Sequence, residues 1–328
     1  MKALVTGGGG FLGGAIIDML LERGMAVRSF ARGAYPALSA KGVQVFQGDL
    51  GDAEAVARAI DGVDVVFHVA AKAGAWGPYE DFHQANVTGT EHVVAGCKRH
   101  GVAKLVYTSS PSVVFNGQDM EGVDESVPYP AEHHAHYPRT KAMAEQFVLA
   151  SNGPHLATVA LRPHLIWGPG DTNLTPRIVS RGRSGRLRRF GGPTKIIDGT
   201  YVDNAAHAHL LAMDRLAPGS AIAGKAYFIA NGEPVPVWDM VNHLLAAAGV
   251  APLDREIPPQ LAYAAGAMLE GVHGLFNLPG EPLMTRWVAE ELATSHWFDL
   301  SAARRDLGYA PIVTLEAGLA RLKASFEA

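Results

Sequence analysis

Short apolar runs alternate with stretches of helical spacing through the first half of the chain. Residues 3–5 form an apolar run long enough for one buried strand, and residues 15–23 place leucine and isoleucine side chains on one side of a helix. The same patterns predict strands over residues 26–31, 43–47, 63–69, 102–108 and 156–161, and helices over residues 52–60, 82–100 and 137–151. Regular alternation of strands and helices predicts an α/β fold built on a doubly wound parallel sheet.

The pattern changes after Arg162 and Pro163. Glycine and proline become frequent, the helical stretches shorten, and strands such as residues 226–229 look isolated. We therefore expect a nucleotide-binding Rossmann domain over residues 1–165, to which residues 195–230 return. Residues 166–194 and 231–328 are predicted to form a smaller C-terminal substrate-binding lobe.

A glycine-rich turn, residues 7–10, separates the first strand from the first helix. Gly8, Gly10 and Gly13 fit one dinucleotide-binding pattern, and Gly7, Gly10 and Gly13 fit another. In either frame the glycines let the backbone approach a pyrophosphate, and the helix N-terminus offers free N–H groups. The order strand, glycine turn, helix predicts a dinucleotide site, since a glycine motif alone would be weak evidence.

The end of the second strand indicates which dinucleotide is bound. NAD-binding versions of this fold usually hold the ribose 2′-hydroxyl with an acidic residue there, whereas this chain has Ala31 and Arg32. An arginine can pair with a 2′-phosphate, which favours NADPH, with NADH as the alternative. The alternative interpretation of Arg32 is an ordinary exposed loop arginine.

A Y-x-x-x-K pattern, Tyr137 and Lys141, lies near the start of a predicted helix. Positions i and i+4 share a helix face, so the phenol and the ammonium can meet one ligand. In a reduction Tyr137 would donate a proton to the developing alkoxide, while Lys141 and the oxidised nicotinamide would favour the phenolate that results. Ser110, at the end of the fifth strand, would hydrogen-bond the substrate carbonyl oxygen.

The whole chain resembles the extended short-chain dehydrogenases/reductases of the 3β-hydroxysteroid dehydrogenase-like group. The matching stretches are LVTGGGGFLG (4–13), GDL (48–50), VFHVAAKAGAWG (66–77), YTSSPSVVF (107–115), YPRTKAMAE (137–145) and LRPHLIWGPG (161–170). The resemblance implies catalytic roles for Ser110, Tyr137 and Lys141. The residues that it and the motifs predict at the dinucleotide are Gly7, Gly10, Phe11, Leu12, Gly13, Arg32, Asp49, Leu50, Ala70, Ala71, Tyr137, Lys141 and Pro163.

Within that group, stretches of both lobes are similar to the 2-alkyl-3-oxoalkanoate reductases of bacterial long-chain olefin biosynthesis. These stretches are KAGAWG, SPSVV, IWGPGD, GKAYFIANGEP and LPGEPLMT. The resemblance implies reduction of a long-chain 2-alkyl-3-oxoalkanoic acid to the 3-hydroxy acid. The alternatives are a 3β-hydroxysteroid or sterol C4-decarboxylating dehydrogenase and, from another class, a dinucleotide-sensing protein without turnover.

Other side chains predict the substrate pocket and its surroundings. Trp76, Phe115 and Trp167 follow strand ends and are expected to line the pocket. The apolar segment 258–278 is interpreted either as core or as a mobile wall for alkyl chains. The basic run over residues 181–189 is either a solvated surface or a site for an anionic group or a partner.

Composition and charge narrow the expected partners and location. A net charge of −4 argues against a general nucleic-acid binder, and one cysteine, Cys97, cannot form an intramolecular disulfide. No signal peptide or transmembrane span is expected, so a cytoplasmic protein is predicted. Histidines 133, 134 and 136 lack further ligands at metal-site spacing, and no metal is expected. A homodimer through residues 82–100 and 137–151 is predicted, and a complex with pathway enzymes is a further expectation. The apolar residues assigned to that interface are Val87, Val93, Val94, Phe147 and Leu149.

Overall fold

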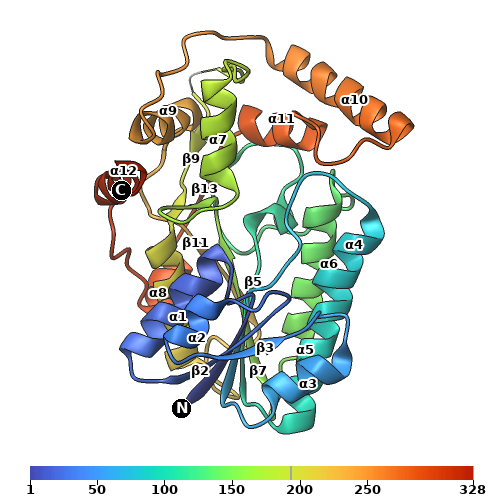
Figure 1. Cartoon of the computed structure of the whole chain (residues 1–328), viewed down its shortest axis with the longest axis vertical. Helices are drawn as coiled ribbons and strands as arrows, with labels where there is room; N and C mark the ends of the chain where they lie inside the picture. Colours follow the sequence, from blue (N-terminus) through green and yellow to red (C-terminus); the bar gives the residue numbers. More distant parts are fainter. Residues whose placement is uncertain (193, 328) are drawn as a thin grey trace.

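A seven-stranded sheet forms the centre of the computed structural model, which describes residues 1–192 and 194–327 (Figure 1). Its order is β3-β2-β1-β4-β5-β7-β11, and every neighbouring pair is parallel. The strands are β1 (Lys2–Thr6), β2 (Ala26–Ala31), β3 (Gln44–Gln47), β4 (Val65–His68), β5 (Lys104–Thr108), β7 (Ala157–Pro163) and β11 (Lys225–Ile229). The predicted fold class is confirmed. The expectation that residues 226–229 form an isolated strand is wrong, because β11 pairs with the edge strand β7.

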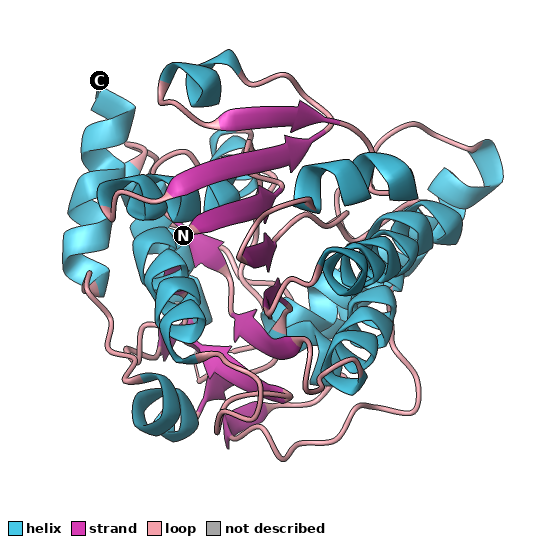
Figure 2. Cartoon of the chain, turned by 90° about the horizontal axis from the view of Figure 1, so that it is seen from below, coloured by secondary structure: helices cyan, strands magenta, loops and turns pink. Residues whose placement is uncertain are grey.

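Helices cover both faces of this sheet (Figures 1 and 2). Ala3 and Val5 of β1 pack with the core of α1 (Phe11–Glu22) and α8 (Val202–Arg215), whereas Leu4 packs with the opposite core. That second core includes side chains of α3 (Ala53–Ile60), α5 (Gly89–His100) and α6 (His136–Ala150). A short helix, α2 (Pro36–Ala40), precedes β3. Both faces of the strands are therefore apolar, as the near-continuous apolar runs indicate.

The helix predicted over residues 82–100 is interrupted. The chain forms α4 (Tyr79–His83), a π-helical turn (Gln84–Thr88) and then α5. The valines assigned to a dimer surface are buried within the subunit, with Val93 0% and Val94 1% exposed. That part of the predicted interface is wrong, because Val87 is also buried and Val93 and Val94 already pack against α3 and the sheet. Phe147 of α6 is 37% exposed and remains available.

A smaller lobe stands on the C-terminal edge of the sheet. Its four-stranded sheet has the order β12-β9-β13-β6, and a second sheet pairs β8 with β10. The strands are β6 (Met120–Val123), β8 (Ile166–Trp167), β9 (Ile196–Ile197), β10 (Thr200–Tyr201), β12 (Val235–Pro236) and β13 (His296–Phe298). The helices are α7 (Leu174–Arg183), α9 (Val237–Ala247), α10 (Pro259–Phe276), α11 (Arg286–Ala293) and α12 (Leu315–Glu327). Because β6 comes from the segment predicted to be purely Rossmann, the two parts interleave in both directions.

The apolar segment predicted as a core or a wall is the helix α10, at the outer edge of the lobe (Figure 1). Only Ala262 and Gly266 of this helix are buried, whereas Met268 is 64% and Leu275 80% exposed. Interpreting this helix as core is therefore wrong. Among the described residues, no helix has both the length and the apolar character needed to cross a bilayer.

Candidate active site

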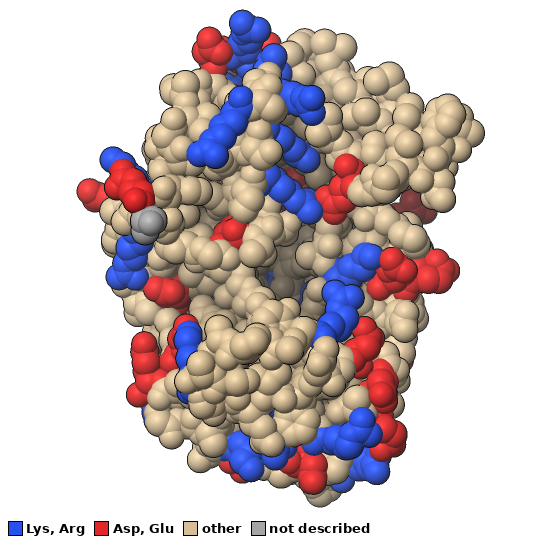
Figure 3. All heavy atoms as spheres, in the orientation of Figure 1, with Lys and Arg blue, Asp and Glu red and all other residues tan. Residues whose placement is uncertain are grey.

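A cavity of about 1090 Å³ opens between the C-terminal edge of the large sheet and the smaller lobe. Figure 3 shows the surface hollowed between the two halves. The cavity meets the sheet beside β1 and β4, which are neighbours although the chain builds β2 and β3 between them. Open α/β sheets bind their ligands where the strand order reverses in this way. None of the five arginines between residues 181 and 189 lines the cavity.

The glycine turn forms one wall of this cavity. Gly7 has a φ of +71°, and its N–H donates to the Phe30 carbonyl at 2.8 Å. A Cβ atom on Gly13 would lie 2.3 Å from the Gly7 carbonyl oxygen, closer than real Cβ contacts come. Any other residue at Gly13 would force the turn apart and displace the N-terminus of α1.

The two glycine patterns differ in their first glycine, Gly7 or Gly8, and the surroundings of these two residues differ. Gly7, Gly10 and Gly13 line the cavity. The space beside Gly8 is occupied by other side chains, since a Cβ atom there would lie 2.5 Å from Ile17 and from Ser29. Gly10 is the N-cap of α1, and no side chain there accepts a hydrogen bond from the first N–H groups of the helix. The first turn of the helix lines the cavity. Such a turn fits a dinucleotide pyrophosphate.

The other predicted cofactor residues continue along the same cavity. Phe11, Leu12, Ala70, Ala71 and Pro163 all line it. At the far end lie Arg32, Asp49, Leu50 and, unpredicted, Tyr35. The Arg32 guanidinium is exposed and makes no hydrogen bond or ion pair with the part of the chain that the structure describes.

Ser110, Tyr137 and Lys141 come together at the opposite end of the cavity. The Lys141 ammonium donates to the Thr108 carbonyl at 2.6 Å, which places it beneath the end of β5. The Ser110 hydroxyl oxygen accepts from the Ser112 hydroxyl at 2.9 Å, so the proton of Ser110 stays available for a ligand. A β-strand end and the first turns of α6 therefore bring the three predicted catalytic groups to one place.

Burial controls the protonation of this group. It raises the pKa of Tyr137, with the Glu291 carboxyl adding to the rise and the hydroxyl of Ser110 opposing it. Burial also lowers the pKa of Lys141 to about 7, against the attraction of Glu145. Without a ligand, burial thus outweighs the lowering of the Tyr137 pKa that Lys141 was expected to cause. The phenol of Tyr137 is therefore protonated at neutral pH. A protonated phenol is a proton donor, which suits the reductive direction.

A buried ion pair supports the back of α6, and the sequence reasoning did not find it. Glu145 accepts from the Arg162 guanidinium at 2.6 Å and from the Tyr129 hydroxyl at 2.5 Å. Both charged side chains are almost fully buried, 0% and 3% exposed. Glu145 lies one helical turn beyond Lys141, so the spacing Lys-x-x-x-Glu was the available signal. Removing one partner of such a pair leaves a buried charge uncompensated.

Of the three aromatic side chains predicted at the substrate, Phe115 lines the cavity. Trp167 is fully buried and packs edge-on against Tyr201 in the core of the lobe. Trp76 packs beside His273 of α10, with ring centroids 6.3 Å apart. Neither tryptophan is among the described residues that line the cavity, so substrate contact by these two stays a prediction without support from the cavity.

The C-terminal lobe adds side chains that the sequence reasoning missed. Trp287, Val288 and Glu291 of α11 and His296 of β13 line the cavity. The Trp287 ring lies 6.3 Å, centroid to centroid, from that of Tyr137. These residues are about 150 positions from Tyr137 in the chain, so no local pattern connects them with it.

Of the three histidines near the start of α6, His133 and His134 precede the helix and His136 is its first residue. His134 pairs with Glu290 of α11 at 2.6 Å. Across the described residues there is no group of three or more His, Cys, Asp or Glu side chains that could hold a metal ion.

Comparison with known proteins agrees with this geometry. Residues 4–258 match the 3-beta hydroxysteroid dehydrogenase/isomerase family. The chain is 55% identical to the 2-alkyl-3-oxoalkanoate reductase of Stenotrophomonas maltophilia, over 99% of both chains. It is 49% identical to the 2-alkyl-3-oxoalkanoate reductase of Shewanella oneidensis, over 98% of this chain and 86% of that one. The crystal structure of Thermus thermophilus UDP-glucose 4-epimerase in complex with NAD has a TM-score of 0.75 and 25% identity, over 100% of this chain and 99% of that one.

These matches extend over both halves of the chain, and the residues that carry the predicted chemistry lie together at the end of a cavity with a glycine turn. The chain therefore belongs to the 3-beta hydroxysteroid dehydrogenase/isomerase family and is an NAD(P)-dependent oxidoreductase.

Proposed function

We propose that this protein reduces 2-alkyl-3-oxoalkanoic acids to 2-alkyl-3-hydroxyalkanoic acids with NADPH. The observation that carries the proposal is the position of Ser110, Tyr137 and Lys141 at one end of a cavity of about 1090 Å³. The full-length similarity to two reductases of that name supports the choice of substrate. The cavity is large enough for a nicotinamide dinucleotide and part of a long-chain keto acid, since ligand pockets generally measure about 300–1,000 Å³.

A nicotinamide dinucleotide held along the turn of Gly7, Gly10 and Gly13 would, when bound, supply hydride to the keto carbon. Ser110 donates a hydrogen bond to the keto oxygen and holds it beside Tyr137. Tyr137 donates its phenolic proton to that oxygen as negative charge develops on it. Lys141 lies one helical turn away and stabilises the phenolate that remains.

Arg32 supports NADPH over NADH. It follows β2 at the place where an acidic residue would hold a ribose 2′-hydroxyl, and its side chain is exposed at the cavity. A guanidinium can pair with a 2′-phosphate through two parallel hydrogen bonds, whereas a ribose hydroxyl offers it no charge.

The deciding experiment compares substrates and cofactors together. We expect oxidation of NADPH, followed at 340 nm, when a freshly prepared 2-alkyl-3-oxoalkanoic acid is added, and a lower kcat/KM with NADH. A 3-ketosteroid tests the alternative substrate class. Turnover of the steroid with none of the keto acid would refute the proposal, and no turnover of either ketone despite tight NADPH binding would favour a sensor.

We also propose a homodimer through α5 and α6, now without the buried valines. Phe147 and Met143 of α6 are 37% and 38% exposed, which leaves apolar area on this surface. Light scattering at micromolar concentration should give about twice the 34.7 kDa mass of the chain. Phe147→Glu should shift the protein toward monomer, and a wild-type monomer would contradict the proposal.

A further inference from the structure

The proposed substrate carries its carboxylate close to the reacting carbon. In a 3-oxo acid the carboxyl carbon is two bonds from the keto carbon, so a keto oxygen held at Ser110 and Tyr137 brings the carboxylate into the same part of the cavity. A buried anion needs hydrogen-bond donors there, because burying it without partners is costly.

Apart from Arg32, at the far end, the lysine and arginine side chains that line the cavity are already engaged. Lys72 pairs with Asp81 at 2.8 Å, and Arg177 pairs with Glu281 at 2.7 Å. Lys141 points to a backbone carbonyl. Donors for the carboxylate must therefore be sought among other side chains that face the catalytic end.

Trp287 offers one donor. Its indole Nε1 is buried and has no hydrogen-bond partner among the described residues, although the ring lines the cavity next to Tyr137. Buried polar groups are nearly always paired, so an unpaired donor in a ligand cavity indicates a partner that arrives with the ligand.

Glu291 offers a second donor. It lies four residues after Trp287 on the same face of α11 and also lines the cavity, with its side chain 21% exposed. The Thr294 hydroxyl donates to the Glu290 carbonyl at 2.7 Å and so must accept from His296 Nε2 at 2.8 Å. His296 therefore carries a proton on Nε2, and its Nδ1 lies 3.9 Å from the Glu291 carboxyl.

Burial and the neighbouring Glu290 raise the pKa of Glu291 to about 8. At pH 7 its carboxyl is therefore mostly protonated and can donate a hydrogen bond. The titratable groups that face it are Tyr137 on α6 and His296 on β13, with His164, directly after β7, beyond His296. Burial lowers the pKa of His296 to about 3 and that of His164 to about 4, so both stay neutral above pH 7.

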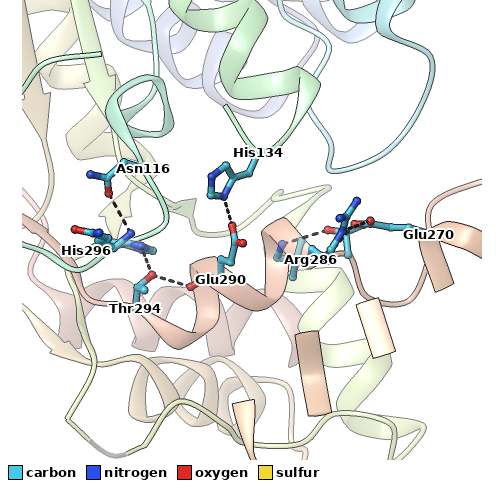
Figure 4. Close-up of polar contacts among 10 residues, drawn as sticks. Asn116, His134, Glu270, Arg286, Glu290, Thr294 and His296 are labelled. Carbon is cyan, nitrogen blue, oxygen red and sulfur yellow. Dashed lines mark hydrogen bonds and ion pairs between the residues drawn. The ribbon is translucent and has the colours of Figure 1, made fainter. Parts of the chain in front are cut away.

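Side-chain contacts hold α11 in place on several sides (Figure 4). Thr285 caps its N-terminus, and Arg286 pairs with Glu270 of α10 at 2.6 Å. Glu290 binds His134, just before the helix that carries Tyr137, at 2.6 Å. The face that bears Trp287 and Glu291 is thus held in a fixed position relative to the catalytic tyrosine.

We propose that Trp287 and Glu291 of α11 bind the carboxylate of the keto acid, each donating one hydrogen bond to it. This inference rests on the proposed function. It explains how the site would distinguish a 3-oxo acid from the ketone that the acid becomes when it loses carbon dioxide.

The test uses the reverse reaction, because the 3-hydroxy acid is stable. Wild-type protein and NADP⁺ are assayed with a 2-alkyl-3-hydroxyalkanoic acid and with the secondary alcohol of the same carbon chain that lacks the carboxyl. The readout is the ratio of the two kcat/KM values, which cancels effects common to both substrates, such as titration of Lys141. If the wild type oxidises the alcohol but not the acid, the proposed function fails and the carboxylate site with it.

Trp287→Phe keeps an aromatic ring and removes the donor. We expect the ratio of acid to alcohol to fall about 10-fold or more, mainly through KM for the acid, since hydrogen bonds to charged groups are stronger than neutral ones. Trp297→Phe on β13, a tryptophan that does not line the cavity, is the matched control and should leave the ratio unchanged. Equal losses for both substrates in Trp287→Phe would mean that the residue only supports the structure.

Glu291→Gln tests whether the protonated Glu291 carboxyl donates to the substrate carboxylate. In the wild type, KM for the acid should rise above pH 8, where Glu291 becomes a carboxylate and repels the substrate, while KM for the alcohol stays level. Glu291→Gln keeps a neutral donor and should abolish that rise. Glu290→Gln should keep the rise but move it to lower pH, because the Glu290 charge no longer raises the pKa of Glu291. Two results together would overturn the inference. KM for the acid would depend on pH in Glu291→Gln as it does in the wild type, and Trp287→Phe would leave the ratio of acid to alcohol unchanged.

Discussion

The turn after β1 lines one part of the cavity and α11, from the segment α10–α11, lines another, but they position their groups in different ways. The turn presents backbone: Gly7 and Gly13 leave no room for a Cβ atom, and α1 begins directly at the cavity. The helix α11 presents side chains, and its place depends on contacts with the neighbouring helix, through Glu270, and with a distant part of the chain, through His134. The glycine turn is therefore built by local sequence, whereas the position of α11 depends on tertiary contacts.

The two helices of that segment also differ from each other. One face of α11 lines the cavity, while α10 exposes most of its apolar side chains, including Leu275 at 80% and Phe276 at 66%. No residue of α10 is among the described residues that line the cavity. α11 thus lines the cavity and α10 packs against α11, so the wall for alkyl chains expected over residues 258–278 stays a prediction without support from the cavity.

The largest expected effect is the loss of turnover when the proton donor Tyr137 is removed. Tyr137→Phe removes the proton donor and leaves the ring, so turnover should fall by about 10²–10⁴-fold while NADPH still binds. Steady-state kinetics and a fluorescence titration of NADPH measure the two quantities. Activity near that of the wild type would refute the role of Tyr137.

The difference between the locally built glycine turn and the tertiary placement of α11 explains how much of the molecule the sequence could predict. The bounds of β2, the N-cap Asp52 of α3 and the residues at the dinucleotide follow from local pattern and motif. The π-helical turn before α5 and the burial of Trp167 depend on what packs against them, so periodicity could not predict them. Trp287 and Glu291 become part of the site only through the fold of the C-terminal lobe.

Cofactor choice gives the next largest effect. Arg32→Ala should weaken NADPH binding by about 1.5–3 kcal/mol, the value of a hydrogen bond to a charged group, and leave NADH nearly unchanged. Dissociation constants for both cofactors measure the change. Equal weakening of the two would show that Arg32 does not contact the 2′-phosphate and that its exposed guanidinium is an ordinary surface charge.

Gly266, at the contact between α10 and α11, tests whether the position of α11 depends on tertiary packing. A Cβ atom on Gly266 would lie 2.7 Å from the Thr285 carbonyl carbon and 2.8 Å from the Arg286 nitrogen, both in the backbone. Gly266→Ala should therefore push α11 away and lower the free energy of unfolding by about 1–3 kcal/mol, as overpacking does. Chemical denaturation measures the loss. We also expect a raised KM for the acid substrate, because Trp287 and Glu291 move with α11.

The smallest effect comes from a second glycine of the same helix and has the opposite sign. Gly271 is exposed, and a Cβ atom there would have nothing within 4 Å. Gly271→Ala should raise the free energy of unfolding by about 0.5–1 kcal/mol, because alanine loses less conformational freedom than glycine in a helix interior. KM for the acid should not change, since this position is away from the contact with α11. If Gly271→Ala destabilised the protein as Gly266→Ala does, the face of α10 that bears Gly271 would be in contact with other residues. The contrast between a packed face at Gly266 and an open face at Gly271 would then be wrong.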